Sequence, residues 1–169
     1  YLNMIKDVLG EDNISALDLG ELKSEYKTAE LFGKLANIGD DIADNFIPDS
    51  STFKKLVTGD RLTARKIYCP PFEFNNYAKM LFSANDIPRI KDKTGAVQRR
   101  LVIIPFNATF SKSDPDYRPY IKYELRKVEN MEYFIKIGIE GLSRVLENMA
   151  FSNSKQVNKE LEEYEEMNN

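Results

Sequence analysis

The chain has 169 residues, of which 42% are hydrophobic and 30% charged, a composition typical of a globular domain that can bury a core. It has no histidine and a single cysteine, Cys69, which excludes Ser-His-Asp triads, Cys-His dyads, intramolecular disulfides and zinc sites rich in these residues. We expect a cytoplasmic protein with no membrane partner, because a single cysteine suits a reducing compartment and no apolar run is long enough for a transmembrane helix.

The charged residues are unevenly distributed along the chain. Residues 1–53 carry 4 basic and 11 acidic side chains, residues 54–100 carry 11 basic and 4 acidic ones, and residues 101–169 carry 9 basic and 12 acidic ones. The positive middle segment indicates an anionic partner such as phosphate or nucleic acid. The alternative is a solvated basic face that pairs with acidic parts of the same fold, and charge alone does not decide between the two.

The first third of the chain is predicted to begin with a helix. Leu2, Ile5 and Leu9 fall on one helical stripe within residues 1–9, and Gly10 provides a stop. Residues 13–17 are a candidate short strand, and residues 19–34 are expected to be mostly helical. The apolar run 35–39 is predicted to be a buried strand.

The middle third contains a helix, a hairpin and two further predicted strands. Ser50 or Ser51 is expected to cap a short helix that ends at Gly59, and residues 61–74 are typical of a protruding hairpin. Residues 79–83 and 101–105 are predicted to be buried strands, separated by a polar, basic loop at 89–100.

Helical spacing dominates the end of the chain, at 120–128, 131–149 and 157–167. Strands that alternate with helices before it predict an α/β fold with a mostly parallel sheet. We expect a core domain over residues 1–110 and a helical segment over residues 111–169. Because ligands of such sheets bind at the carboxyl ends of the strands, we expect a site there.

Polar residues follow two of the three main predicted strands. Asp40 and Asp41 come directly after the run 35–39, and paired carboxylates suit Mg²⁺ and the activation of water for attack on a phosphate. Asn85 follows the run 79–83 and is suited to orient that water or contact a γ-phosphate. The alternative for all three residues is an ordinary turn after a strand, where Asp and Asn are common.

Two groups of basic residues are further candidates. Arg99 and Arg100 precede the run 101–105, and arginine matches phosphate oxygens with a fixed fork of donors. The second group lies in and before the predicted hairpin, where three of its members interleave with Tyr68, Phe72 and Phe74, a pattern that suits contact with a nucleic-acid backbone. This second group comprises Lys54, Lys55, Arg61, Arg65 and Lys66. Ion pairs or solvated strand edges are the alternatives for both groups.

The order of these motifs resembles the superfamily III helicases, most closely their phage and plasmid primase–helicase branch. Four segments over roughly residues 1–150 carry the resemblance: LANIGDDIAD (35–44), FKKLVTGDRLTARK (53–66), AKMLFSANDIP (78–88) and GAVQRRLVIIPF (95–106). The resemblance implies a three-layer core of AAA+ type and ATP-driven unwinding of DNA. It also implies a ring of copies of the chain, usually a hexamer, in the cytoplasm of a bacterial host, often with a primase domain fused upstream.

The resemblance also implies a role for each candidate residue. Asp40 becomes the Walker B carboxylate that holds Mg²⁺ through water, and Asp41 stands where the family often has the glutamate that activates water. Asn85 becomes the sensor of motif C. Arg100, or Arg99 as the close alternative, becomes the finger that reaches the ATP of a neighbouring subunit. Further basic residues, listed above for the hairpin and the preceding helix, face DNA in the central channel.

One element of the family pattern is missing from these residues. The Walker A loop, GxxxxGK[ST], cradles the phosphates of ATP, and the 169 residues do not contain it. We expect it directly upstream of Tyr1, together with the first strand of the core, so that this chain alone binds nucleotide poorly. The alternatives are a binding module that engages DNA or a replication partner without hydrolysis, and a purely structural α/β domain.

Overall fold

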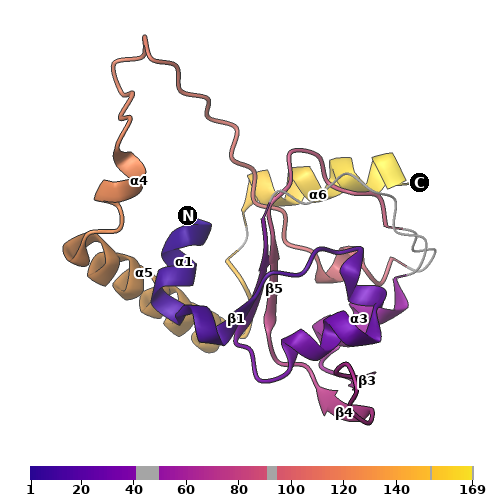
Figure 1. The fold of residues 1–169 in the computed structure, drawn as a ribbon. Helices are drawn as coiled ribbons and strands as arrows, with labels where there is room; N and C mark the ends of the chain where they lie inside the picture. The colour runs from indigo at the N-terminus through magenta and orange to yellow at the C-terminus, as the bar shows by residue number, and fades with distance from the viewer. Residues whose placement is uncertain (41–49, 91–94, 153, 169) are drawn as a thin grey trace.

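The computed structural model describes residues 1–40, 50–90, 95–152 and 154–168 (Figure 1). Its strands are β1 (Ile14–Ser15), β2 (Ala36–Gly39), β3 (Arg61–Ala64), β4 (Phe72–Asn75) and β5 (Lys79–Phe82). Its helices are α1 (Leu2–Leu9), α2 (Glu25–Thr28), α3 (Ser51–Thr58), α4 (Ile121–Glu124), α5 (Val128–Asn148) and α6 (Lys155–Asn168). Short 3-10 turns are η1 (Glu11–Asn13), η2 (Glu21–Lys23), η3 (Ala29–Leu31) and η4 (Gln98–Arg100).

A small parallel sheet forms the centre of the molecule, in the order β1-β2-β5. Its strands pair in a register that places Ala36 opposite Ile14 and Gly39 opposite Phe82. All four residues of β2 are buried, as expected of a strand covered on both faces. The predicted α/β class with a mostly parallel sheet and C-terminal helices is confirmed.

The two faces of the sheet are covered by different elements. On one face, Ile14, Ile38 and Leu81 pack against the apolar stripe of α1, formed by Leu2, Ile5 and Leu9. On the other face, Met80 and Phe82 border the larger core. That core takes its buried side chains from the turns before β2, from α3 and from the hairpin. The alternation of side chains along each strand produces this division.

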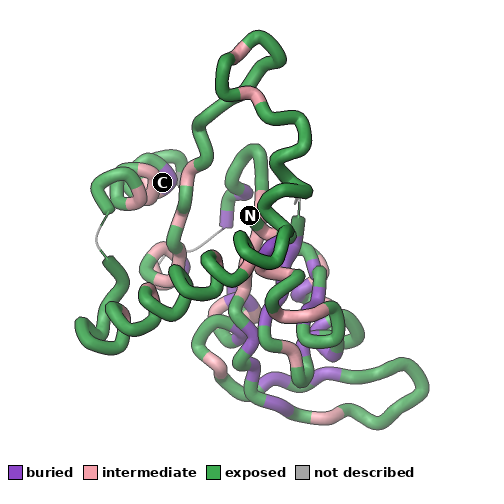
Figure 2. Tube along the Cα trace, turned by 90° about the vertical axis from the view of Figure 1, so that its left-hand side faces the viewer, coloured by how far each residue is buried: buried purple, intermediate pink, exposed green. Residues whose placement is uncertain are grey.

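The hairpin between β2 and β5 is separate from the central sheet. Its strands β3 and β4 pair antiparallel, with Leu62 opposite Phe74, and both of these side chains are buried. Residues 65–71 between the strands are exposed. Figure 2 shows this hairpin at the lower edge of the molecule, with strands in which buried and exposed residues alternate and which lead to an exposed tip. The predicted protruding hairpin is confirmed.

One predicted strand is absent from the structure, and one predicted helical segment is divided. The run 101–105 is not a strand: Val102 and Ile104 are more than half exposed, and no strand within the described residues pairs with the run. An apolar run becomes a strand only where a neighbouring backbone offers its N–H and C=O groups. Residues 19–34 are mostly helical, as expected, but as the short turns η2, α2 and η3; the helical segment breaks at Ser24, whose hydroxyl caps α2 by accepting from the N–H of Lys27.

The C-terminal segment contacts the rest of the chain at several points, among them a ring contact between Tyr1 and Phe134 of α5. Arg126 forms a two-pronged ion pair with Asp7 of α1, with Nη2 at 2.6 Å from Oδ1. Tyr164 of α6 is buried, and its hydroxyl donates to the carbonyl of Pro88 over 3.2 Å. The predicted boundary between 110 and 111 stays a prediction. None of the helices in the described segments combines the length and apolarity that crossing a membrane requires.

Candidate functional site

The carboxyl ends of β2 and β5 meet at one edge of the sheet. Because Gly39 and Phe82 are paired, the next residue of each strand lies at the same level, and these residues are Asp40 and Ser83. The hydroxyl of Ser83 donates to Oδ1 of Asp40 over 2.5 Å, and its backbone N–H donates to the carbonyl of Gly39 over 2.9 Å. Asp40 is exposed, and the hydrogen bond from Ser83 holds its carboxylate in a defined orientation.

A buried amide lies in β2 just before this edge. The side chain of Asn37 is fully buried; its Oδ1 accepts from the N–H of Leu17 at 2.8 Å and from the hydroxyl of Ser15 at 2.9 Å. Its Nδ2 donates to the carbonyl of Leu17 at 2.9 Å. Asn37 therefore fixes the segment after β1 alongside β2, and no role was predicted for it from the sequence.

The other predicted residues of this edge are placed in part. Asn85 is exposed, in a bend two residues after Ser83. Asp41 lies outside the described residues. Oxygen ligands are those that Mg²⁺ prefers, so Asp40 and Ser83 are chemically suited to a metal that is held through water. Within the described segments no group of three or more metal-binding side chains is present, so the predicted metal role depends on Asp40.

Arg99 and Arg100 are the last two residues of the short turn η4. Val97, almost fully buried, anchors the turn in the core. Arg99 is exposed and donates from Nε to the carbonyl of Gly95 over 3.3 Å, while Arg100 is half-buried and donates from Nη1 to the carbonyl of Ala96. Each guanidinium is thus oriented by the loop that precedes it.

The basic residues of the hairpin differ in their contacts. Arg61 forms an ion pair of 2.8 Å with Glu73 on the opposite strand. Arg65 donates from Nε to the carbonyl of Cys69 over 3.1 Å, which closes the exposed tip. Lys66 follows Arg65 in the tip and is exposed.

The remaining basic candidates precede the hairpin, on α3. Lys55 is exposed and Lys54 is half-buried. The buried side chains of this helix, Phe53 and Leu56, fix it to the core. The helix starts after Ser50 and ends at Gly59, which has a φ of 74°. The expected start and stop of the helix are confirmed.

The hairpin tip also presents the aromatic ring of Tyr68, a residue that the sequence analysis noted only as a neighbour of the basic residues. Tyr68 is completely exposed and has a φ of 61°, an uncommon value for a residue other than glycine. An N–H from Cys69 to the carbonyl of Lys66, over 3.0 Å, holds the turn in this shape. The tip therefore offers a positive charge and a flat apolar ring to whatever approaches it.

Comparison with known proteins supplies one family. The family model described as "Family of unknown function (DUF5906)" matches residues 1–100, more than half of the chain. The chain belongs to this family. The DUF5906 region contains Asp40, the hairpin, Asn85 and both arginines, whereas α4, α5 and α6 follow it.

A curated protein also resembles part of the chain. It is named "Putative helicase L207/L206", comes from Acanthamoeba polyphaga mimivirus, and is 39% identical over 61 residues. The aligned region covers 36% of this chain and only 6% of the viral protein, so the chain spans a small fraction of the length of that relative.

Proposed function

We propose that this DUF5906 chain is part of a helicase-type ATPase, the core of a ring-forming superfamily III replication protein that moves along DNA. The observation that carries the proposal is the meeting of Asp40 and Ser83 at the carboxyl edge of a parallel sheet, with an exposed basic hairpin inserted between their strands. The partial similarity to a viral protein named as a helicase supports it.

Each residue group has a distinct role in this proposal. Asp40, oriented by Ser83, would hold Mg²⁺ through water, and the ion would supply positive charge to the phosphates of ATP. Asp41 accepts a proton from the attacking water, and Asn85 helps to orient that water. Arg100, or Arg99, contacts the nucleotide of the adjacent subunit. The hairpin, through Arg65 and Lys66, transmits movement to DNA.

The 169 residues contain no Walker A loop, so in this proposal the longer natural polypeptide supplies it. In the described sheet β5 is a terminal strand, with β2 on one side. We accordingly place the ATPase activity in a longer natural polypeptide, with a primase domain fused to it as in the family that the motifs resemble, and with a hexameric ring as the working form.

ATP hydrolysis with and without single-stranded DNA tests the proposal. It is measured on the 169-residue chain and on the longest natural polypeptide that contains it. We expect DNA-stimulated hydrolysis in the longer polypeptide only, and its loss in Asp41→Asn and Arg100→Ala. Arg118→Ala, which removes an exposed arginine from the segment after the core, is the matched control and should retain hydrolysis.

Mixed rings test whether subunits share the site. Asp41→Asn and Arg100→Ala subunits are each expected to be inactive, but a mixture should regain part of the activity, because some interfaces then combine an intact carboxylate with an intact arginine. Absence of any recovery would assign Arg100 to its own subunit. DNA binding without hydrolysis in every polypeptide would replace the proposal with the non-catalytic binding module.

A further inference from the structure

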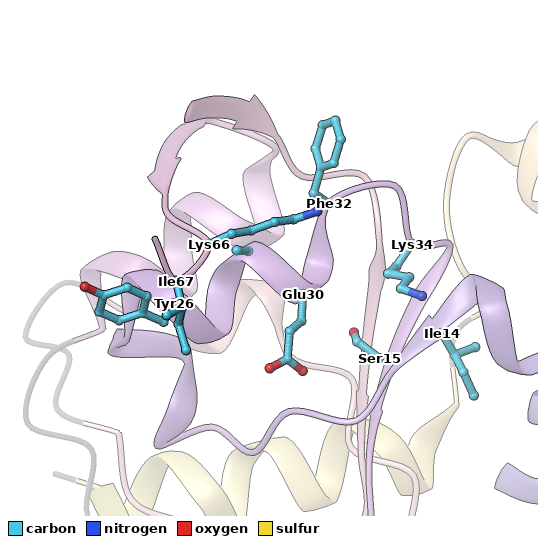
Figure 3. A pocket seen from close by; sticks show the side chains of 9 residues that line it. Ile14, Ser15, Tyr26, Glu30, Phe32, Lys34, Lys66 and Ile67 are labelled. Carbon is cyan, nitrogen blue, oxygen red and sulfur yellow. The ribbon is translucent and has the colours of Figure 1, made fainter. Parts of the chain in front are cut away.

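A second site lies away from the carboxyl edge of the sheet. It is an open pocket of about 670 Å³, within the range of sizes that small ligands occupy. The segment before β2, the exposed tip of the hairpin and β1 contribute its walls (Figure 3). Lys34, which precedes β2, is part of this wall, whereas Asp40 follows β2, so the two sites lie at opposite ends of that strand. The lining side chains are Ile14, Ser15, Tyr26, Ala29, Glu30, Phe32, Lys34, Lys66 and Ile67.

One aromatic ring of this pocket is exposed and nevertheless fixed in place. Phe32 is 56% exposed, and its ring makes edge contacts with Phe72 at 5.3 Å and Phe74 at 5.6 Å between ring centroids. These two rings come from β4, so the hairpin supports Phe32 from one side. A ring held in this way presents an aromatic surface without a large loss of side-chain freedom on binding, as base stacking requires. Tyr26, 49% exposed, offers a second ring in the same pocket.

The charges of the pocket suit a phosphate together with a base. The ammonium of Lys34 donates to the carbonyl of Asp12 over 2.6 Å and is therefore fixed at the rim. Lys66 extends across the pocket toward Phe32 in the view of Figure 3. Glu30 is the one carboxylate in the lining, and Lys27 pairs with it at 3.4 Å, which offsets its repulsion of an anion. A carboxylate in such a position accepts hydrogen bonds from the amino groups of bases.

The pocket is continuous with the hairpin tip. Lys66 and Ile67 line it, and the next residue is the fully exposed Tyr68. The N–H of Arg65 donates to the carbonyl of Glu25 over 3.1 Å, which fixes the base of the tip to α2. A polyanionic strand that contacts the tip therefore has a pocket of aromatic and basic side chains directly beside it.

We propose that this pocket binds one nucleotide of single-stranded DNA, with the base against Phe32 and the flanking phosphates near Lys34 and Lys66. The inference rests on the proposed function, because it takes DNA to be the partner of the hairpin. It adds a stacking site for a base. Of the basic residues predicted to contact DNA, only Lys66 lines this pocket.

Fluorescence anisotropy with a labelled single-stranded oligonucleotide of thymidines tests the site on the 169-residue chain. Phe32→Leu keeps an apolar side chain over Phe72 and Phe74 but removes the flat ring, and we expect affinity to fall about 10-fold. Phe32→Tyr should bind as the unchanged protein does. Tyr77→Leu, at an exposed aromatic residue outside the pocket, is the matched control and should have little effect.

Salt dependence and crosslinking give two further readouts. Lys66→Gln and Lys34→Gln should each lower the slope of log affinity against log salt by about one, because one phosphate contact is lost. An oligonucleotide with 5-iododeoxyuridine should crosslink at Phe32 or Tyr26. A mononucleotide, dTMP, should compete only at far higher concentration than the oligonucleotide, since it lacks the flanking phosphates and the hairpin contacts.

The outcomes separate this inference from the proposed function. Unchanged affinity in Phe32→Leu, together with weaker binding in Tyr68→Ala, would overturn the pocket and leave the hairpin as the DNA contact. Equal competition by dTMP and the oligonucleotide would assign the pocket to free nucleotides and overturn the inference. No binding of the oligonucleotide by the unchanged protein would overturn both the inference and the DNA role of the hairpin.

Discussion

The hydroxyl of Ser83 donates a hydrogen bond of 2.5 Å to Oδ1 of Asp40, which links the residues that follow two paired parallel strands. The position of the contact follows from the register, because Gly39 lies opposite Phe82. A serine in this position can orient a carboxylate without contacting the reacting atoms. Ser83 is thus a positioning residue for the proposed ATPase.

Replacement of Ser83 tests that role. In the longest natural polypeptide, Ser83→Ala should lower ATP hydrolysis about 10- to 100-fold, as loss of a partner that orients a metal-associated ligand generally does. Because both groups are at the surface, the free energy of unfolding should change by less than about 1 kcal/mol. Ser83→Thr retains a hydroxyl and should restore much of the activity. Steady-state hydrolysis and urea unfolding measure the two effects.

A serine elsewhere supplies the control for this prediction. Ser113→Ala removes an exposed hydroxyl from the segment between the core and α4, and hydrolysis should stay unchanged. Full activity in Ser83→Ala would contradict the positioning role. If Ser83→Ala lost activity only because a large part of the protein was unfolded, as urea unfolding would show, the hydrogen bond would serve the fold alone.

The sequence predicted the elements whose signals are local. The segments 35–39 and 79–83, each with several consecutive apolar residues, became β2 and β5, and Gly59 ended α3 as expected. These signals are local, because each depends only on a few neighbouring residues. Asp40 was found because a carboxylate directly after a buried strand is visible in the sequence. The run 101–105 was mispredicted because a strand also requires a partner, which a local pattern does not contain.

Other features depend on contacts between distant residues. Ser83 is an ordinary residue after a strand until the sheet places it beside Asp40. Phe32 lay within a segment predicted to be mostly helical, and its ring becomes an exposed platform only through contacts with β4, some 40 residues later. Asn37 could have been noticed as the one amide in an apolar run, since a buried polar group needs hydrogen-bond partners.

The amide of Asn37 gives a prediction about stability. Asn37→Ala should lower the free energy of unfolding by about 3 kcal/mol, because the N–H and carbonyl of Leu17 and the hydroxyl of Ser15 lose buried partners. Asn148→Ala removes an exposed amide whose Nδ2 donates to the carbonyl of Arg144, and it should cost less than about 1 kcal/mol. Urea unfolding measures both. Similar urea midpoints for the two variants would contradict the stabilising role assigned to the hydrogen bonds of Asn37 with Ser15 and Leu17.

Two glycines give a pair of opposite expectations. A Cβ on Gly39 would lie 2.8 Å from Cδ1 of Phe82 and 2.9 Å from the carbonyl oxygen of Leu17, so Gly39→Ala should destabilise by about 1–3 kcal/mol. A Cβ on Gly138 of α5 would meet no atom within 4 Å, and Gly138→Ala should stabilise by about 0.5–1 kcal/mol through its helix propensity. Thermal unfolding measures both. A stable Gly39→Ala would show that the β2 edge can shift without loss of packing.

The carboxylate of Glu21 gives a prediction about pH. Its pKa is lowered from the usual 4.5, first because it accepts a hydrogen bond from the N–H of Asp18 and also because Lys27 lies near it at 3.3 Å. A group with a lowered pKa in the folded state contributes stability above its unfolded pKa and loses that contribution as pH falls through the folded value. Lys27, whose pKa is raised by the same pair, stays charged throughout this range.

The Glu21→Gln variant should therefore be less stable than the unchanged protein near neutral pH, and the difference should shrink as pH falls below about 4.5. Glu129→Gln makes the same change of charge at an exposed position of α5 and serves as the control. Urea midpoints at a series of pH values between about 3 and 7 measure the effect. A difference that stays constant over this range, or that grows toward acid, would contradict the contribution assigned to the bond with Asp18.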